Sequence, residues 1–499
     1  MDSVVTGSSS EAVRWLPWGN EAFKRARIER LPVLLAIGAA WCQGCARMLG
    51  TTYRDKFVCE LIHENFIPIW VDTDLRPDIN ERYNLGGWPT TAFLSPAGQL
   101  LGGETFVDVS RMVTLLQEVS LTFQRKYREI ETVSLISKPS CEAVHEFSAA
   151  KEIQALIGWY ESCLIEHYDQ VHGGFDASPK RVHPAAVQFM LTRVSSGDSS
   201  LRQMALKTLD AIGWGELFDD VSGGVFRYCA GEAWTDPQYE KLLSVNASVL
   251  DLFLEGWLVL GEDRYRDRAQ DVIRYVSATL SDHVEGGFFS SQYANEDYYR
   301  LEADFREKSD VPFVDQAVYA DGTAEMSAAY VRAAEIFNDP SLLQFAVASM
   351  ERVVGTSYER GRGIAHDVNQ GQVIRGLLRD QVLVSGTLIH LYEATDREVY
   401  LDLAQELIRY VLRVFLDQDS GGLFDRVSHQ NDIGLMREVM KPLEINCAAV
   451  RVLVSLGEIT SNAEFHERAT ALLFSQVQIA KKQGIGAGSF AVTALTLDI

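Results

Sequence analysis

The sequence predicts two domains, an α/β domain followed by an all-α (α/α)6 toroid. The first observation is length, because 499 residues exceed what one domain usually holds. The second is that residues 1–130 alternate strand-length apolar runs with amphipathic helical patterns. The third is that the rest of the chain consists of amphipathic helices separated by glycine-rich turns at similar intervals. We therefore place the α/β domain at 1–130, a linker at 131–147 and the toroid at 148–499.

The elements of the first domain follow a recognisable order. The run Val33-Leu34-Leu35-Ala36-Ile37 is apolar throughout, as a strand buried on both faces requires. The predicted elements are a helix over 15–30, strands over 33–37 and 66–71, helices over 43–65 and 76–83, strands over 91–95 and 99–101, and a closing helix over 108–130. With Cys42-Gln43-Gly44-Cys45 between the first strand and the next helix, this is the thioredoxin arrangement.

Cys42 and Cys45 are the predicted catalytic pair. Cys42 stands at the start of a predicted helix, where unpaired N–H groups and the helix dipole favour a thiolate, so it is the expected nucleophile. Cys45 lies one turn later and is the expected resolving thiol. Because Gln43 and Gly44 add no positive charge, we expect a mild reductant rather than a strong oxidant.

Three further residues are predicted to bind the substrate. Pro89 is expected to be a cis-proline that packs beside the two sulfurs and presents backbone to a substrate chain. Trp41 and Trp88 are expected to shape the docking surface next to it.

Two alternatives to a redox dithiol remain open. A single Cys-x-x-Cys also fits half of a zinc site, although no second such pair or Cys/His pair follows at zinc-ligand spacing. The domain also fits an inert thioredoxin-like scaffold. Ala36 stands where thioredoxins usually carry a buried carboxylate, so the proton acceptor for Cys45 is either missing or replaced by Asp72 or Asp74. Those two acids equally fit a solvated strand end.

The second domain is predicted from six glycine signatures. The first glycines of the first and last signatures, Gly173 and Gly484, lie five intervals apart, about 62 residues each, which is enough for two helices and their loops. The signatures are Gly173-Gly174-Phe175, Gly223-Gly224-Val225-Phe226, Gly286-Gly287-Phe288-Phe289, Gly361-Arg362-Gly363, Gly421-Gly422-Leu423-Phe424 and Gly484-Ile485-Gly486. Six helical hairpins close a toroid, and a linear solenoid is the alternative.

Acidic and aromatic residues surround these turns and leave two interpretations open. A cleft lined by acids and aromatics suits carbohydrate, and paired carboxylates could act as acid and base in glycoside cleavage. Aspartates beside glycines are also ordinary turn residues. The flanking acids are Asp169, Asp219, Asp220, Asp417, Asp419 and Asp425, and His183, His366 and His429 are histidines that a sugar epimerase could use.

Composition restricts partners and location. With 46 basic and 69 acidic residues, the formal charge of −23 disfavours nucleic acid and anionic membranes. We expect no membrane span, because no apolar run approaches the ~20 residues that a span needs. The first ten residues lack a signal-peptide pattern, which predicts a cytoplasmic protein. We expect no cofactor and no metal.

Several motifs together resemble the spermatogenesis-associated protein 20-like family, and the resemblance covers nearly the whole chain. They are Pro17-Trp18-Gly19-Asn20-Glu21-Ala22-Phe23, Trp41-Cys42-Gln43-Gly44-Cys45-Ala46-Arg47-Met48, Gly86-Gly87-Trp88-Pro89-Thr90, Ser178-Pro179-Lys180, Gly223-Gly224-Val225-Phe226-Arg227-Tyr228 and Tyr239-Glu240-Lys241-Leu242-Leu243. The resemblance implies a thioredoxin-type active site followed by a sugar-hydrolase-like or epimerase-like toroid of poorly defined activity.

The departures from that family concern the toroid more than the dithiol. The family is histidine-rich around its cysteines, where this chain has Gln43-Gly44 and Ala46, and it carries a His and an Asp near Glu240 that this chain lacks. The residues that remain as a possible toroid pocket are Glu240, Lys241, Asp315 and Asp380. Losing polar groups weakens the case for toroid catalysis, whereas the dithiol is intact.

Three functions follow from these observations. The leading hypothesis is a thiol–disulfide oxidoreductase that acts on a protein disulfide, with a toroid that selects the partner or binds a sugar-like ligand. The second is a non-catalytic scaffold or assembly subunit of a larger complex. The third is a carbohydrate-active hydrolase or epimerase using Glu240, Asp315 or Asp380.

Overall fold

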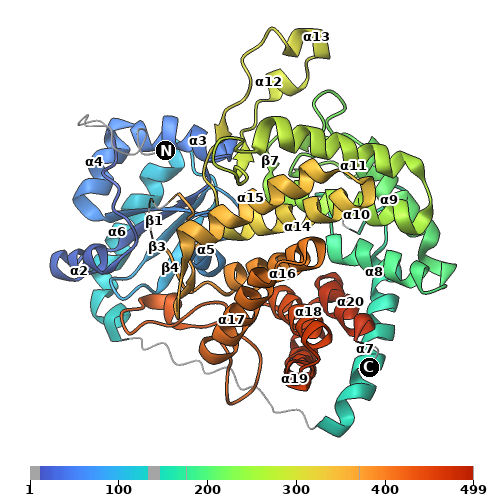
Figure 1. Ribbon diagram of the computed structural model, residues 1–499. Helices are drawn as coiled ribbons and strands as arrows, with labels where there is room; N and C mark the ends of the chain where they lie inside the picture. Colours follow the sequence, from blue (N-terminus) through green and yellow to red (C-terminus); the bar gives the residue numbers. More distant parts are fainter. Residues whose placement is uncertain (1–11, 133–145, 176, 370, 372, 498–499) are drawn as a thin grey trace. The chain divides into compact units, whose positions relative to one another are not determined.

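The computed structural model describes residues 12–132, 146–175, 177–369, 371 and 373–497, and Figure 1 shows the ribbon. The chain divides into two compact units, Met1–Ser140 with Ser428–Val439, and Cys141–Val427 with Met440–Ile499. Residues 428–439, which we had placed in the toroid, thus group with the first unit. Most of the predicted linker, residues 133–145, lies outside the described residues.

A four-stranded mixed sheet in the order β2-β1-β3-β4 forms the centre of the first unit. β1 runs parallel to β2, with Val33 opposite Ile67, and antiparallel to β3, which pairs in turn with β4. β1 and β3 are buried along their whole length, which explains why both are continuously apolar or small. The strands are β1 (Val33–Gly38), β2 (Ile67–Asp72), β3 (Thr90–Leu94) and β4 (Leu100–Glu104).

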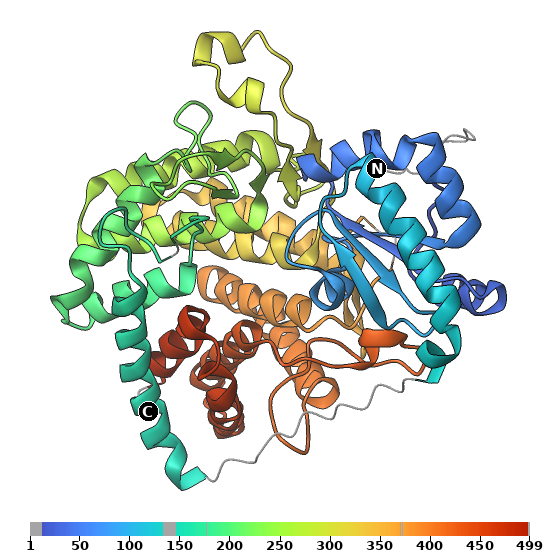
Figure 2. The same ribbon diagram turned by 180° about the vertical axis from the view of Figure 1, so that it is seen from behind.

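Helices cover both faces of this sheet (Figure 2). One apolar cluster joins the sheet to α2 and α5, and another joins it to α3, α4 and α6. The helices are α2 (Asn20–Glu29), α3 (Gln43–Gly50), α4 (Lys56–Asn65), α5 (Pro77–Tyr83) and α6 (Val109–Thr132). This is a thioredoxin-like domain, as the order of sequence patterns predicted.

Two predicted helices have different limits in the structure. The helix predicted over 43–65 is interrupted, because Asp55 caps a new helix by accepting hydrogen bonds from the Phe57 and Val58 amides at 3.0 Å. The helix predicted over 15–30 begins at Asn20, since Leu16 is drawn into a parallel bridge with Ile69 at the edge of the sheet.

The segment Ser428–Val439 completes the core of the first unit. Ile433 and Met436 are buried in the same apolar cluster as Tyr83. The Tyr83 hydroxyl donates to the Gly98 carbonyl at 2.7 Å and accepts from the Leu435 amide at 2.8 Å. A piece of chain more than 300 residues away in sequence therefore supplies part of this core.

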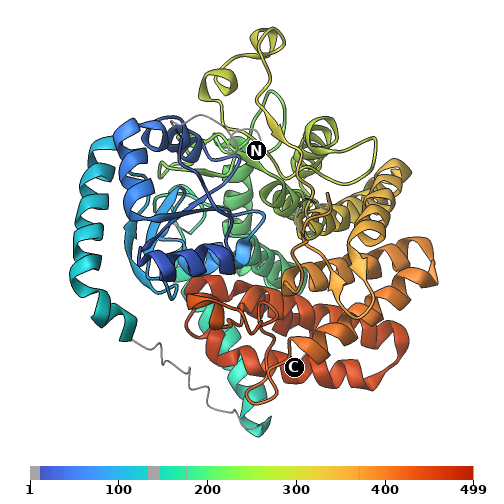
Figure 3. The ribbon, with the colours of Figure 1, turned by 90° about the vertical axis from the view of Figure 1, so that its left-hand side faces the viewer.

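The second unit is a closed ring of six inner helices, each packed against the next, with α20 returning to α8. The inner helices are α8 (Pro184–Ser195), α10 (Leu243–Leu260), α14 (Ala320–Phe337), α16 (Leu378–Thr395), α18 (Leu443–Thr460) and α20 (Gly488–Thr496). The outer helices are α7 (Glu146–His167), α9 (Arg202–Trp214), α11 (Asp263–Tyr275), α15 (Pro340–Ser357), α17 (Glu398–Val414) and α19 (Ala463–Ala480). The colours of Figure 3 follow these hairpins from green through yellow and orange to red. The predicted toroid is confirmed.

Short strands and two small helices occupy the connections of the ring. They are β5 (Tyr228–Cys229), β6 (Pro237–Gln238), β7 (Lys241–Leu242), β8 (Ser291–Gln292), β9 (Val314–Asp315), β10 (Tyr358–Glu359), β11 (Gly363–Ile364), α12 (Glu296–Tyr299) and α13 (Ala303–Arg306). α12 and α13 belong to an excursion between β8 and β9 that extends away from the ring in Figure 1.

One inner helix passes a simple test for a membrane span. Among the described residues, α10 alone is long and apolar enough to cross a membrane by length and composition. Its position between α8 and α14 explains this apolar character, because 56% of it is buried inside the ring.

Candidate functional site

Cys42 and Cys45 lie where β1 ends and α3 begins. Cys42 is the N-cap of α3, and its Sγ accepts a hydrogen bond from the Cys45 amide at 3.2 Å. The two cysteines are not joined by a disulfide and are buried, with exposed fractions of 3% and 1%, while the intervening Gln43 is exposed. An amide that points at the sulfur at a helix N-terminus stabilises a thiolate on Cys42 more than a thiol.

Pro89 lies directly against this turn. The Trp88–Pro89 peptide is cis, and a Cβ placed on Gly44 would come within 3.1 Å of Pro89 Cδ and 3.8 Å of Cys42 Sγ. A side chain at position 44 would therefore press against Pro89, which would have to move by a few tenths of an ångström. The structure thus brings Pro89 beside the two cysteines, the arrangement that the sequence analysis expected.

Trp41 and Trp88 meet edge to face beside the dithiol, with ring centroids 5.6 Å apart. Each indole N–H has a polar partner, since Trp41 donates to Asp74 at 2.7 Å and Trp88 donates to Asn80 at 3.0 Å. These bonds hold the orientation of the two rings. Asp74, one of the two acids suggested as a proton acceptor, is thereby engaged by Trp41.

The environment of Cys45 favours its protonated form. The pKa of the Cys45 thiol is raised by its hydrogen bond with Cys42, by burial and by the nearby negative charge of Asp72. Asp72 ends β2 opposite Gly38, and its Oδ1 accepts from the Asp74 amide at 2.9 Å. Of the two suggested acids, Asp72 is therefore the one that acts electrostatically on Cys45.

Four glycine turns of the second unit share one backbone pattern. Asp169, Asp219, Asp282 and Asp417 each stand four residues before a Gly-Gly pair. In every case the first glycine amide donates to the aspartate carbonyl, and the aspartate amide donates to the carbonyl of the second glycine. The carboxylate also accepts from the amide two residues later. These acids are turn residues, the alternative left open beside the carbohydrate interpretation.

A cation from later in the chain closes each of these turns. The Lys241 ammonium donates to Asp219 at 2.6 Å and to the Gly223 carbonyl at 2.7 Å. Lys180, Arg352 and Lys441 bind the corresponding aspartate and glycine carbonyl in the other three turns. The cation follows its aspartate by 11, 22, 70 or 24 residues, so no constant spacing could reveal it in the sequence.

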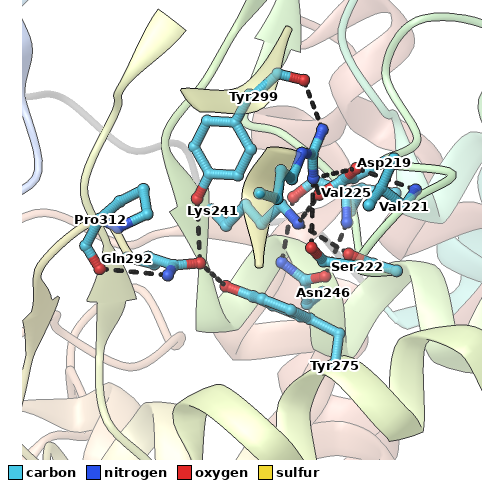
Figure 4. Close-up of polar contacts among 12 residues, drawn as sticks. Asp219, Val221, Ser222, Val225, Lys241, Asn246, Tyr275, Gln292, Tyr299 and Pro312 are labelled. Carbon is cyan, nitrogen blue, oxygen red and sulfur yellow. Dashed lines mark hydrogen bonds and ion pairs between the residues drawn. The ribbon is translucent and has the colours of Figure 1, made fainter. Parts of the chain in front are cut away.

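The Asp219 turn carries an additional cation and an aromatic enclosure (Figure 4). Arg306 of the α12–α13 excursion donates to both Asp219 oxygens at 2.8 Å. The Lys241 ammonium lies 4.1 Å from the Tyr275 ring centroid, and burial lowers its pKa to about 8. The Tyr275 and Tyr299 hydroxyls both donate to Gln292 Oε1. Lys241, predicted as a possible pocket residue, is thus fully occupied by the turn that it holds.

The other predicted pocket residues lie apart from one another. Glu240 is buried and pairs with Arg227 at 3.4 Å. Asp315 lies in β9, where its Oδ1 accepts from the Ala317 amide and burial raises its pKa. Asp380 lies in the first turn of α16, 2.8 Å from His366 Nδ1. These contacts do not join the predicted residues into a single site.

A cavity of about 580 Å³ lies inside the helix ring, and none of Glu240, Lys241, Asp315 or Asp380 lines it. Its ionisable side chains are Asp251, Glu325, Arg332, His390 and Arg451, which come from four inner helices. The sequence analysis did not identify these five residues. The available signal was an ionisable side chain at a position of an inner helix that is otherwise apolar. No Phe, Tyr or Trp is among the described residues that line this cavity.

The charges in the cavity are largely paired. Arg332 contacts Asp251 at 2.5 Å and also binds Glu255. Glu325 contacts Arg379 at 2.5 Å, yet burial raises the pKa of Glu325 to about 7. Glu325 can therefore gain or lose a proton near neutral pH, a property that suits an acid–base residue.

Comparison with known proteins supports both halves of the fold. Residues 3–138 match the family Thioredox_DsbH, described as a protein of unknown function, DUF255. Spermatogenesis-associated protein 20 of Mus musculus is 30% identical over 307 residues, which are 57% of this chain and 39% of that protein. The Homo sapiens protein is 28% identical over 308 residues, with the same shares of each chain. The chain thus spans 39% of the length of these relatives, and the resemblance read from the motifs is confirmed over 57% of this chain rather than nearly the whole of it.

Solved structures resemble the helical ring. Cellobiose 2-epimerase from Bacillus thermoamylovorans superimposes with a TM-score of 0.53 at 10% identity, covering 65% of this chain and 85% of the epimerase. An α-mannanase of glycoside hydrolase family 76 from Bacteroides thetaiotaomicron gives 0.53 at 11% identity, covering 70% of this chain and 97% of the mannanase. At these identities the likeness shows the toroid fold alone.

Proposed function

We propose that this protein is a thiol–disulfide oxidoreductase that acts on a protein disulfide through Cys42 and Cys45. One observation carries the proposal: the Cys42 sulfur caps α3 and accepts the Cys45 amide at 3.2 Å, which favours a thiolate on the first cysteine only. The raised pKa of Cys45 supports the same division of roles.

The reaction has two thiol–disulfide exchange steps. The Cys42 thiolate attacks one sulfur of the substrate disulfide, forming a mixed disulfide and releasing the other substrate sulfur as a thiolate. Cys45 then loses its proton and attacks Cys42 Sγ, which forms the Cys42–Cys45 disulfide and releases the second substrate thiol. The substrate gains the two electrons that the dithiol loses, and a thiol reductant such as glutathione or a dithiol protein restores the enzyme.

The neighbouring residues have separate roles in these steps. Pro89 and the Trp41–Trp88 pair flank the turn that holds the sulfurs and would contact the substrate chain. Asp72, whose charge acts on Cys45, would accept the proton that Cys45 releases in the second step. This role takes the place of the carboxylate that Ala36 cannot supply.

Trapping of a mixed disulfide tests the proposal. In Cys45→Ser the second step is blocked. Mixed disulfides between Cys42 and substrate proteins should therefore accumulate, and a reductant should release them. Cys59→Ser is the matched control, because Cys59 is a buried thiol of the same unit that lies outside the turn. Absence of Cys42-dependent adducts in Cys45→Ser would refute the mechanism and favour the scaffold hypothesis.

A carbohydrate ligand in the ring cavity is a second candidate function. The cavity of about 580 Å³ is large enough for a small sugar, and the elevated pKa of Glu325 provides an acid–base group in it. The described lining has no Phe, Tyr or Trp on which a sugar ring could stack, which counts against a carbohydrate site. A sugar-dependent thermal shift that Glu325→Gln abolishes would support this function, and no shift with mono- and disaccharides would refute it.

A further inference from the structure

Three potential metal ligands converge at the starts of two neighbouring inner helices. Asp321 lies in the first turn of α14 and Asp380 in the first turn of α16, and these helices pack together. His366 follows β11 and places its Nδ1 2.8 Å from Asp380 Oδ1 and 3.8 Å from Asp321 Oδ1. One donor atom from each residue lies within 4.8 Å of the others.

One carboxylate oxygen of this group is buried and has no hydrogen-bond partner among the described residues. Asp380 is fully buried, and its Oδ2 has no hydrogen-bond partner among the described residues. Burial raises the pKa of Asp380, which reflects the cost of a carboxylate in that position. A buried carboxylate oxygen is normally hydrogen-bonded or bound to a cation, so Asp380 Oδ2 is an acceptor that a bound cation could use.

We propose that Asp321, His366 and Asp380 form a binding site for a divalent transition-metal cation such as Zn²⁺ or Mn²⁺. The imidazole nitrogen suits Zn²⁺, which also accepts carboxylate oxygens, and the two carboxylates suit the harder Mn²⁺. An ion about 2.0–2.2 Å from each donor separates neighbouring donors by about 3–3.5 Å, and the observed 2.8 and 3.8 Å bracket that range. Three protein ligands leave a position for water, as in catalytic rather than structural zinc sites.

The surroundings hold the three ligands in place. The His366 ring stacks on Tyr319 with centroids 4.8 Å apart, and the His366 carbonyl accepts from the Ala320 amide at the start of α14. Arg379 lies 3.4 Å from Asp321 Oδ2, the oxygen that does not face His366.

Metal analysis of the full-length chain tests the site. Because a Cys-x-x-Cys pair also binds zinc, the experiment uses Cys42→Ser/Cys45→Ser as the parent. After equilibration with Zn²⁺ and gel filtration, mass spectrometry should find one zinc per chain. Asp321→Asn and His366→Gln should each lower the Zn²⁺ affinity by at least about tenfold. Mutation of residues that only hydrogen-bond to metal ligands already costs about tenfold, and loss of a ligand should cost no less.

The matched control is His172→Gln. His172 lies 3.2 Å from Asp169 in a comparable histidine–aspartate contact that has Lys180 rather than a second acid beside it. Zinc that is absent from the parent, or retained unchanged in both Asp321→Asn and His366→Gln, overturns the proposal. Visible absorption of bound Co²⁺, lost in His366→Gln and kept in His172→Gln, provides a second readout. Since the parent has no dithiol, failure here leaves the proposed oxidoreductase function unaffected.

Discussion

The turn before α3 and the turn around Asp219 each bury a potentially reactive side chain, and they treat it differently. At Cys42, a backbone amide favours one protonation state of a sulfur that can change state. At Lys241, a carboxylate, a carbonyl and an aromatic ring occupy the ammonium and hold it in place. Burial and a shifted pKa therefore do not by themselves identify a reactive group. The hydrogen-bond and ionic partners of the side chain determine whether it can change its protonation state.

Loss of the nucleophile has the largest expected effect. Cys42→Ser should reduce disulfide-reductase activity to the uncatalysed background, because no other described cysteine lies at a helix N-terminus beside Pro89. The measurement is thiol release from a protein disulfide, with Cys59→Ser as the control that keeps its activity. Equal loss in both variants would contradict a specific role for this turn.

Replacing the lysine that binds the Asp219 turn should lower the stability of the protein. Lys241→Met removes one of the two cations that bind the buried Asp219 carboxylate and should lower the free energy of unfolding, by at most the about 3–5 kcal/mol that a wholly unpaired buried charge costs. Lys441→Met breaks the corresponding ion pair with Asp417, in which the two side chains are 14% and 17% exposed. A smaller loss of unfolding free energy is therefore expected. Urea unfolding compares them. A smaller loss of unfolding free energy in Lys241→Met than in Lys441→Met would contradict the view that burial sets the strength of these ion pairs.

The 428–439 segment provides a more moderate test in the first unit. Tyr83→Phe removes the hydroxyl that bridges Gly98 and Leu435 and leaves two buried backbone groups without it, at a cost of about 1–3 kcal/mol. Hydrogen exchange over α5 and the segment should accelerate. Tyr392→Phe, which alters a half-buried tyrosine of α16, should leave this exchange unchanged.

A further prediction is that the stability depends on pH through Glu325. The folded-state pKa of Glu325 is about 7 against an ordinary value of 4.5, so the folded state holds the extra proton. Its contribution to stability is complete below about pH 4.5 and is lost as the pH rises through about 7. Glu325→Gln should therefore flatten the fall in unfolding free energy between these values, by no more than about 3 kcal/mol. The exposed Glu458→Gln should not change that slope.

Local sequence patterns predicted the first unit well, because its chemistry is carried by neighbouring residues. β1, Cys42, Cys45 and α3 are contiguous, and Pro89 precedes an evident strand. The break of the predicted 43–65 helix depends on Asp55 as a cap, a signal that apolar spacing does not contain. Burial of residues 428–439 in this unit depends on contacts across more than 300 residues, which no local pattern reveals.

The toroid was predictable as architecture and poorly predictable as a site. Six glycine signatures gave the number of hairpins, and hydrophobic spacing gave the helices. The partners of Asp219, namely Lys241 and Arg306, lie 22 and 87 residues away. Asp380 was predicted as a pocket residue and His366 was noted only as a lone histidine, but their contact across 14 residues required the fold.

The most direct test of the central claim is the redox equilibrium of Cys42 and Cys45. The protein is equilibrated in glutathione or dithiothreitol buffers, and the fraction of disulfide is read by mass spectrometry after alkylation. We expect a reversible two-electron couple at roughly −180 to −270 mV, the range of working thiol oxidoreductases. If the pair never forms a disulfide, or forms one that these buffers cannot reduce, the protein is not a thiol oxidoreductase and the scaffold hypothesis remains.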